Sequence, residues 1–415
     1  MVVAPRWFNL FIKNTFGRFL LYRYNARCVG ADVIEGVAPP YLLIPNHVNY
    51  WDPFLLGVFI PQPVYYVAAD GNFRTRIMRR LLRLVGAIPK AKAKSDTATV
   101  RTMGELLRRG QIVGVFAEGQ RTWDGESLSP LPATAKLLRL FKTTVVVPHL
   151  RGAYLSLPRW SPFRRKGALE IHFDRSRVLP AHRLKEMSLS EIDRWLREAL
   201  RFSETDWQRS RRLPYPSRRQ AEFAETLLYA CPGCHGFSTL RSEGAQIRCL
   251  SCGSSVVMDR YGALSGHFEA VRDWNRWQQS HLDNTLREWW NAGEEQAFAK
   301  SGPLTLRVGR GSSPLRHRGT VTVRLLRSGL EVTPLRVTGS CRDRWGTEGW
   351  TIPFNSIHAV HVQLRQDLEF YYRRQLYVLR PTSLRESTHF WEMLITRSQS
   401  LLELDRQRSS PIEQR

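Results

Sequence analysis

The sequence lacks a long apolar run and an apolar N-terminal leader. Its longest uncharged stretch, residues 53–69, is interrupted by Pro61, Gln62 and Pro63, whereas a membrane-spanning helix needs about 20 mostly apolar residues. We therefore expect no transmembrane span. Because no apolar run ends in small residues near the N-terminus, we also expect no secretory signal and a cytoplasmic chain.

Acidic residues are scarce as well. The chain has 37 of them against 62 lysines and arginines, which gives a net charge of +25 over 415 residues. A field of that sign attracts nucleic acid, anionic lipid headgroups or phosphorylated substrates, and charge alone does not choose among these partners. The length is sufficient for two or three domains, each with its own core.

Cysteine is rare, but four of the six cysteines form two Cys-x-x-Cys pairs separated by fourteen residues. Without a secretory signal, this spacing indicates metal binding instead of disulfides. The four thiolates of Cys231, Cys234, Cys249 and Cys252 fill all positions of a tetrahedral site and leave none open for a substrate. We therefore predict a structural zinc ion in a zinc ribbon over residues 228–258.

Residues 1–28 are predicted to form an amphipathic helix, because apolar side chains recur at helical spacing between residues 8 and 20. One interpretation is a helix packed on its own domain. The other is a helix lying in a membrane interface, with cations at the headgroups. The basic stretch Arg74–Lys94 pairs cations with apolar residues in the same way and leaves the same two alternatives.

Residues 29–205 alternate short apolar runs with helical periods, which indicates an α/β domain with a largely parallel sheet and surrounding helices. We expect a linker at 206–227, the ribbon at 228–258 and a helical connector at 259–300. Residues 301–415 read as several short strands closed by one helix at about 384–402, a pattern that resembles a PH-like domain.

The first chemical motif is Asn46-His47-Val48-Asn49-Tyr50-Trp51-Asp52. His47 follows a short apolar strand, and the Asp52-Pro53 pair is typical of a helix start, with Asp52 as the N-cap. A carboxylate in this position can accept the Nδ1 proton of the imidazole and leave Nε2 free to act as a base.

The second motif, Val115-Phe116-Ala117-Glu118-Gly119-Gln120-Arg121-Thr122, also ends an apolar strand. Its glycine permits a tight turn beside a guanidinium, and guanidinium is the group best matched to phosphate oxygens. In isolation the segment is equally consistent with a surface turn that carries a solvated charge pair.

Together the motifs resemble the glycerolipid acyltransferase family that includes 1-acylglycerol-3-phosphate acyltransferase. That family carries an Asn-His-x4-Asp block and a Phe-Pro-Glu-Gly-Thr-Arg-Ser block, which here read NHVNYWD and FAEGQRT. Residues 86–92 (GAIPKAK) and 145–148 (VVVP) resemble two further blocks, in the family's order. Lysine stands where the family has arginine in the block at 86–92, Ala117 where it has proline, and Gln120 where it has threonine. The acceptor need not be lysophosphatidate itself.

The resemblance implies an enzyme that moves a fatty acyl group from a thioester, either acyl-CoA or acyl carrier protein, to a lysophospholipid hydroxyl. The expected acceptor is 1-acylglycerol-3-phosphate, which would give phosphatidic acid. His47 would be the general base and Asp52 its orienting partner, with no catalytic cofactor. The expected substrate-binding residues are Asn46, Lys90, Lys92, Glu118, Gly119 and Arg121. We expect a peripheral protein on the cytoplasmic face of an anionic phospholipid membrane.

Two alternatives stay open. One is an acyltransferase that acts on a different lyso-lipid acceptor. The other is a nucleic-acid-binding protein, which the positive charge, the ribbon and the aromatic residues would fit. The second alternative leaves the His47 and Glu118 blocks unexplained, so we expect no nucleic-acid partner.

Overall fold

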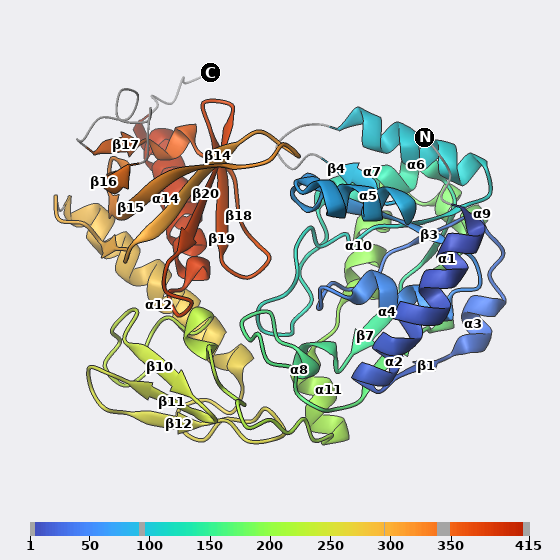
Figure 1. Cartoon of the computed structure of the whole chain (residues 1–415), viewed down its shortest axis with the longest axis horizontal. Helices are drawn as coiled ribbons and strands as arrows, with labels where there is room; N and C mark the ends of the chain where they lie inside the picture. The colour runs from blue at the N-terminus through green and yellow to red at the C-terminus, as the bar shows by residue number, and fades with distance from the viewer. Residues whose placement is uncertain (1–4, 91–95, 294, 338–348, 410–415) are drawn as a thin grey trace. The chain divides into compact units, whose positions relative to one another are not determined.

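The computed structural model describes residues 5–90, 96–293, 295–337 and 349–409 (Figure 1). The chain divides into two compact units. The first comprises residues 1–221 together with 257–265 and 269–272, and the second comprises 222–256, 266–268 and 273–415. The main boundary, at residue 221, falls inside the segment predicted to be a linker.

The centre of the first unit is a six-stranded sheet of order β4-β3-β5-β2-β6-β9. The first five strands run parallel to their neighbours and only β9 is antiparallel, so the predicted largely parallel sheet is present. The strands are β2 (Tyr41–Leu43), β3 (Val64–Ala69), β4 (Ile88–Lys90), β5 (Ile112–Gly114), β6 (Thr144–Val146) and β9 (Val178–Leu179).

Helices alternate with these strands along the chain. They are α3 (Ala31–Glu35), α4 (Asp52–Phe59), α5 (Arg76–Leu84), α6 (Thr97–Arg108), α7 (Pro132–Phe141), α9 (Ala181–Glu186) and α10 (Leu189–Leu200). The core brings Leu42, Val113 and Val145 of the middle strands against buried side chains of α6, α7 and α10. Burial on both faces explains why these strands read as continuous apolar runs in the sequence.

A second sheet of the first unit has the order β1-β8-β7 and contains β1 (Ala26–Val29), β7 (His149–Arg151) and β8 (Leu169–His172). The apolar segment 144–151 therefore forms two strands, β6 and β7, which belong to different sheets. Pro148 lies between them, and a residue without an amide hydrogen cannot continue a sheet ladder.

The N-terminal segment forms one helical rod made of α1 (Arg6–Ile12), the π-helix η1 (Lys13–Gly17) and α2 (Arg18–Tyr24). One face is covered by protein, with Leu20 and Tyr24 each only 3% exposed. The opposite face is open, and Trp7 and Tyr22 there are 69% and 88% exposed. The apolar residues of this rod are therefore divided between two faces.

The segment 206–227, expected to be a linker, is instead packed into the structure. It begins within α11 (Glu204–Arg211), which follows α10 in the chain; the short helix α8 (Ala153–Ser156) lies earlier in the same unit. Tyr215 is completely buried, and its hydroxyl donates to the carbonyl of Ala168 at 2.5 Å. Its ring lies against Gly167, where an added Cβ would come within 2.0 Å of it. A buried aromatic ring fixes the segment despite its polar composition.

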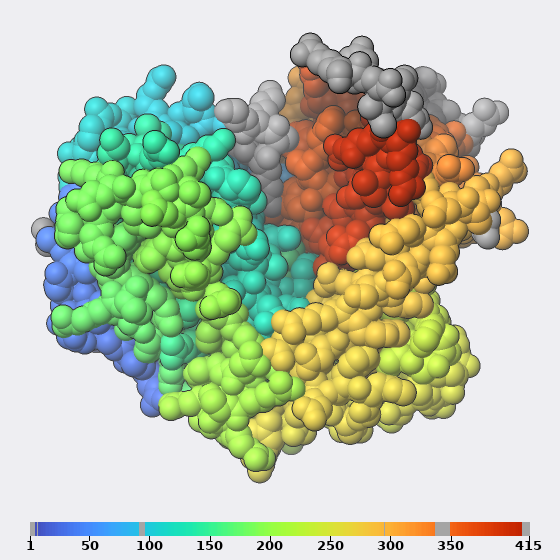
Figure 2. Space-filling model, turned by 180° about the vertical axis from the view of Figure 1, so that it is seen from behind, coloured from blue at the N-terminus to red at the C-terminus, as the bar shows by residue number. Residues whose placement is uncertain are grey.

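The second unit contains a small antiparallel sheet of β10 (Leu240–Glu243), β11 (Gln246–Cys249) and β12 (Ser255–Val257), whose last residue already belongs to the first unit. The long helix α12 (Val271–Ala292) follows, and Figure 2 shows its gold residues as a continuous ridge on the surface. Trp274 and Trp290 face inward from this helix and are almost fully buried.

Residues 299–409 form the predicted β-rich part. Its eight-stranded sheet has the order β17-β16-β15-β14-β20-β19-β18, with β13 paired to β15. The strands are β13 (Ala299–Lys300), β14 (Leu304–Gly309), β15 (Arg316–Leu326), β16 (Gly329–Val337), β17 (Trp350–Ile352), β18 (His358–Gln363), β19 (Asp367–Tyr372) and β20 (Gln375–Pro381). The closing helix α14 (Thr388–Ser409) starts four residues later than the expected position and packs on β18 and β19.

The packing of Tyr215 makes a stability prediction. Tyr215→Ala should lower the free energy of unfolding by about 3–5 kcal/mol, as for other buried aromatic truncations, and Tyr215→Phe by about 1 kcal/mol through loss of one hydrogen bond. Tyr22→Ala, at an exposed position, should stay within about 0.5 kcal/mol of the wild type. Urea denaturation followed by circular dichroism measures all three. A Tyr215→Ala protein as stable as Tyr22→Ala would mean that the segment is an unattached linker.

Candidate functional site: a histidine–aspartate pair at the edge of the parallel sheet

The predicted catalytic motifs follow neighbouring parallel strands. His47 follows β2, while Glu118 and Arg121 follow β5, which pairs with β2. Lys90 is the last residue of β4, two positions beyond β5 in the sheet. The carboxyl ends of parallel strands meet at the same edge of a sheet, and ligands of α/β proteins bind there. The topology thus brings the three motifs to one edge.

His47 and Asp52 are in direct contact. The Nδ1 atom of His47 lies 2.9 Å from Oδ2 of Asp52. The Asp52 carboxylate is completely buried and also accepts hydrogen bonds from the backbone amides of Val48, at 2.8 Å, and of Asn49, at 2.9 and 3.0 Å. With Asp52 ionised, the His47 proton resides on Nδ1 and Nε2 keeps its lone pair.

The sequence suggested that Asp52 is the N-cap of α4, and this prediction is wrong. Trp51 occupies the N-cap position, and Asp52 is the first residue of the helix. Its carboxylate turns back toward the amides of Val48 and Asn49 in the preceding loop. The same bonds that satisfy the buried charge therefore also fix the loop that carries His47.

The surroundings of His47 keep its imidazole neutral. The ring stacks on Phe116, with centroids 3.9 Å apart. Burial lowers the pKa of His47 below its usual value of 6.5; the hydrogen bond to Asp52 opposes this shift, and the charges of Arg121 and Arg159 add to it. A neutral imidazole with a free Nε2 atom can accept a proton at physiological pH.

Glu118 holds two loops together. Its Oε1 atom accepts a hydrogen bond from the backbone amide of His47 at 2.9 Å, and Oε2 accepts one from the amide of Leu128 at 2.8 Å. Burial raises the pKa of this carboxyl to about 8, against the effect of the two bonds. Both oxygens are thus engaged with backbone, and the geometry favours a positioning role over the direct substrate contact that we expected.

Gly119 and Arg121 shape the loop after β5. Gly119 has a φ of +73°, a backbone conformation that favours glycine, and an added Cβ would come within 2.9 Å of the Leu131 side chain. The next fixed point is the amide of Thr122, which donates to the carbonyl of His47 at 3.0 Å. The Thr122 amide therefore holds the backbone next to Arg121 close to that of His47.

Arg159 is a residue of this site that the sequence motifs did not reveal. It is only 4% exposed, and its Nη1 atom donates to the carbonyl of Arg121 at 2.7 Å. Its guanidinium carbon lies 4.0 Å from the ring centroid of Trp123. It lies outside every block used for the prediction, and one arginine in a chain rich in arginine carries no distinguishing signal.

The remaining predicted binding residues have different surroundings. Asn46 is buried, and its side chain exchanges hydrogen bonds with the backbone of Leu150 on β7, at 2.7 and 3.1 Å. This contact fixes the end of β2. Lys90 is exposed at the end of β4, and Lys92 lies outside the described residues.

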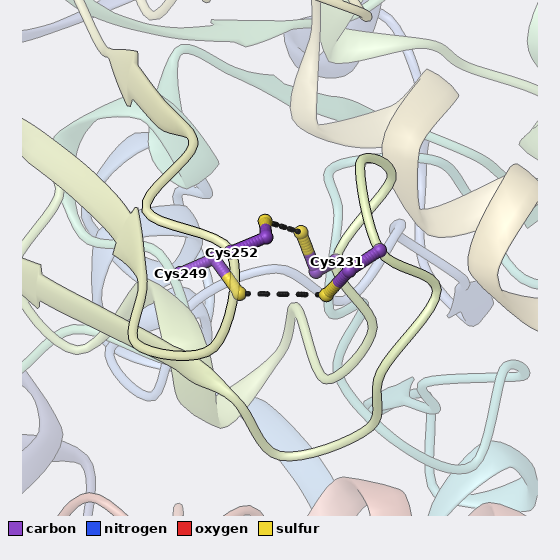
Figure 3. A group of neighbouring side chains, drawn as sticks. Cys231, Cys249 and Cys252 are labelled. Atoms are coloured by element: carbon purple, nitrogen blue, oxygen red, sulfur yellow. Dashed lines mark hydrogen bonds between the residues drawn. The ribbon is translucent and has the colours of Figure 1, made fainter.

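The four cysteines of the second unit converge (Figure 3). The sulfur atoms of Cys231, Cys234, Cys249 and Cys252 all lie within 4.8 Å of one another. The Cys231–Cys252 and Cys234–Cys249 sulfur pairs are each 3.7 Å apart. A tetrahedral ion with metal–sulfur bonds of about 2.3 Å requires sulfur separations of about 3.8 Å. The cluster therefore fits a four-coordinate metal ion, whereas disulfide bonds of about 2 Å are excluded by these distances.

Comparison with known proteins finds a family likeness within the first unit. Residues 26–150 match the acyltransferase family model. The matched residues include the His47, Glu118 and Arg121 motifs.

One curated protein has a similar sequence over part of its length. Over 83 residues the chain is 28% identical to 1-acyl-sn-glycerol-3-phosphate acyltransferase from Bacillus subtilis (strain 168). The match covers 20% of this chain and 42% of the relative. The chain therefore spans less than half the length of that relative.

Two solved structures were also found. One is the crystal structure of the 1-acyl-sn-glycerophosphate acyltransferase PlsC from Thermotoga maritima, with 17% identity, coverage of 49% of this chain and 79% of that chain, and a TM-score of 0.40. The other is the solution structure of the C-terminal PH domain of human FYVE, RhoGEF and PH domain containing protein 3, with 16% identity, coverage of 30% and 99%, and a TM-score of 0.17. At these scores neither likeness establishes a shared fold, and the PH-like assignment of residues 301–415 stays a prediction.

The cysteine cluster makes a prediction about metal content. Purified protein should contain about one zinc ion per chain, because four thiolates form one closed site. The variant Cys231→Ser, Cys249→Ser, which removes the two buried ligands, should lose the ion and unfold the small sheet β10–β12. Cys28→Ser changes a half-buried cysteine outside the cluster and should keep the metal. Elemental analysis by mass spectrometry distinguishes the three proteins, and a metal-free wild type purified without chelator would contradict the assignment.

Proposed function

We propose that the protein transfers a fatty acyl group from a thioester donor to the free hydroxyl of a lysophospholipid. The observation that carries this proposal is the contact between His47 and buried Asp52, at the carboxyl edge of the sheet and within the residues that match the acyltransferase family model. The contact leaves Nε2 as a base beside the cationic side chain of Arg121, which suits an anionic acceptor.

The chemistry follows from that base. Nε2 of His47 takes the proton of the acceptor hydroxyl while the oxygen attacks the thioester carbonyl. The tetrahedral intermediate then collapses, the carbon–sulfur bond breaks, and the leaving thiolate recovers a proton from His47. Asp52 stabilises the imidazolium that forms between these steps, because its carboxylate stays on Nδ1 throughout. No cofactor is required, since a thioester is already an activated acyl donor; acyl-CoA and acyl carrier protein are both suitable donors.

The acceptor is proposed to carry a phosphate. Arg121 lies near enough to His47 for its charge to lower the pKa of the imidazole, and Arg159 is held beside it. Two guanidinium groups next to the base suit a phosphate ester whose hydroxyl reaches Nε2. We propose 1-acylglycerol-3-phosphate as the first acceptor to test, with phosphatidic acid as the product. Because this chain departs from the family's blocks at several positions, a different lysophospholipid is the second acceptor to test.

We further propose that the enzyme works as a peripheral protein on the cytoplasmic face of an anionic membrane. No helix within the described ranges has the length and apolar character to cross a bilayer. The N-terminal rod exposes Trp7, Phe11, Phe19 and Tyr22, and α5 exposes Ile77 at 72% together with its arginines. Exposed aromatic side chains next to cations are typical of helices that lie in the interface.

The zinc ion is proposed to be structural. The four sulfur atoms complete its coordination, and the cluster belongs to the second unit while His47 and Asp52 belong to the first. The ion would hold the two knuckles of the small sheet together. It has no part in the acyl transfer.

Removal of the base tests the mechanism. His47→Ala should lower kcat/KM by about 10²–10⁴, the usual effect of losing a general base. It should also lower the melting temperature while the protein still folds, because the buried Asp52 carboxylate keeps its bonds to the loop amides but loses the imidazole. Asp52→Asn should lower both activity and stability, because its carboxylate also holds the loop amides. Turnover of a labelled acyl thioester and lysophosphatidate is the measurement. A folded His47→Ala protein with turnover near that of the wild type would refute the assignment.

The pKa of His47 makes a second prediction. Because only neutral His47 can act as base, kcat/KM should fall as the pH drops through the pKa of His47, which lies below 6.5. In Arg121→Gln, loss of the neighbouring positive charge should move this acidic limb to higher pH. The same variant should raise the acceptor KM about tenfold or more through loss of a charged hydrogen bond, with the donor KM nearly unchanged. An unchanged acceptor KM would exclude Arg121 from the acceptor site.

A further inference from the structure

The covered face of the N-terminal rod packs against α4, the helix that begins with Asp52. At one end of α4, Nζ of Lys13 donates to the carbonyl of Ile60 at 2.8 Å. At the other end, the ring of Phe16 packs edge-on against Trp51 and Phe54, with centroids 5.4 and 5.3 Å apart. The rod thus contacts both ends of α4.

Between these ends, Gly17 of the rod lies directly against the side chain of Val58 on α4. Gly17 is buried, and a Cβ added to it would lie 2.5 Å from Cγ2 of Val58. Real Cβ atoms do not tolerate this distance, so an alanine at position 17 would displace the Val58 side chain or move the rod relative to α4. Glycine inside a helix costs about 1 kcal/mol relative to alanine, and the close contact is the physical reason for a glycine here.

We infer that Phe16 and Gly17 are positioning residues for the proposed acyl transfer, acting through α4 on Asp52. This inference rests on the proposed function. The outer face of the same rod, with Phe11 56% and Phe19 55% exposed, is free for a lipid surface. One helix then serves as membrane contact on its outer face and as support for the Asp52–His47 contact on its inner face.

The physical reason is orientation. The Asp52–His47 contact is a single hydrogen bond of 2.9 Å, and displacement of a reacting group by about 1 Å costs on the order of 10²-fold in rate. A shift of α4 would move the Asp52 carboxylate away from Nδ1. Such a shift lowers kcat without altering the outer face.

Gly17→Ala in the full chain is the main test. Alanine favours the helix, so any loss comes from the contact with Val58. We expect kcat at saturating donor and acceptor to fall at least tenfold. The acidic limb of the pH profile should move to lower pH, because a weaker contact with Asp52 lowers the pKa of His47. Vesicle partitioning on phosphatidylcholine with phosphatidylglycerol should stay within twofold of the wild type. The double variant Gly17→Ala, Val58→Ala makes room for the new methyl group and should recover most of the lost kcat.

Two further variants complete the comparison. Asn14→Ala places the same new side chain on the exposed face of the rod and should leave kcat unchanged. Phe19→Ala should lower vesicle partitioning. Gly17→Ala with normal kcat, or a loss of kcat that the double variant does not recover, would overturn the inference.

A readout that needs no turnover separates this inference from the proposed function. Hydrogen exchange of the Val48 and Asn49 amides, which donate to Asp52, should be faster in Gly17→Ala and normal in Asn14→Ala. Unchanged exchange at these amides would overturn the inference, even in an active enzyme. Wild-type protein that exchanges as expected but transfers no acyl group to any lysophospholipid would instead overturn the proposed function.

Discussion

The carboxylate of Asp52 is completely buried and is satisfied by the two loop amides and the imidazole that precede it by five residues or fewer. A buried charge that loses a partner costs several kcal/mol, so this arrangement is strongly fixed. The loop of residues 46–51 takes its shape from it, and so does the tautomer of His47. Glu118 then holds the His47 amide from the neighbouring strand, Asn46 ties the loop to β7, and the N-terminal rod supports α4 from behind.

Three of the residues expected to bind substrate have structural contacts that stabilise the loops around His47 and Asp52. The polar side-chain atoms of Asn46 and Glu118 form hydrogen bonds with backbone groups. Gly119 provides a turn whose backbone conformation favours glycine. Arg121, Arg159 and Lys90 are then the cations near the proposed acceptor. The acidic and amide side chains of these motifs thus stabilise the loops that carry His47.

The sequence predicted the parallel sheet, the helices that cover it and the elements that carry His47 and Asp52, because apolar periodicity and short motifs are local signals. It also predicted the cysteine cluster, since four ligands at fixed spacing have few other uses. Contacts between distant segments left no such signal. Arg159 reaches Arg121 across 38 residues, and Tyr215 makes the polar stretch 206–227 part of a core through its contact with Ala168. The division of the N-terminal aromatics into a covered and an open face likewise depends on α4, which local periodicity does not show.

The central claim is the reaction itself, and product identification tests it most directly. Purified wild-type protein would be incubated with an isotope-labelled acyl-CoA, or the same acyl group on acyl carrier protein, and with a set of lysophospholipids that includes 1-acylglycerol-3-phosphate. Lipid mass spectrometry then identifies any new product. We predict label in a diacyl phospholipid, with phosphatidic acid foremost, and none with His47→Ala. Label that appears only as free fatty acid, or no labelled lipid with any acceptor and either donor, would contradict the account.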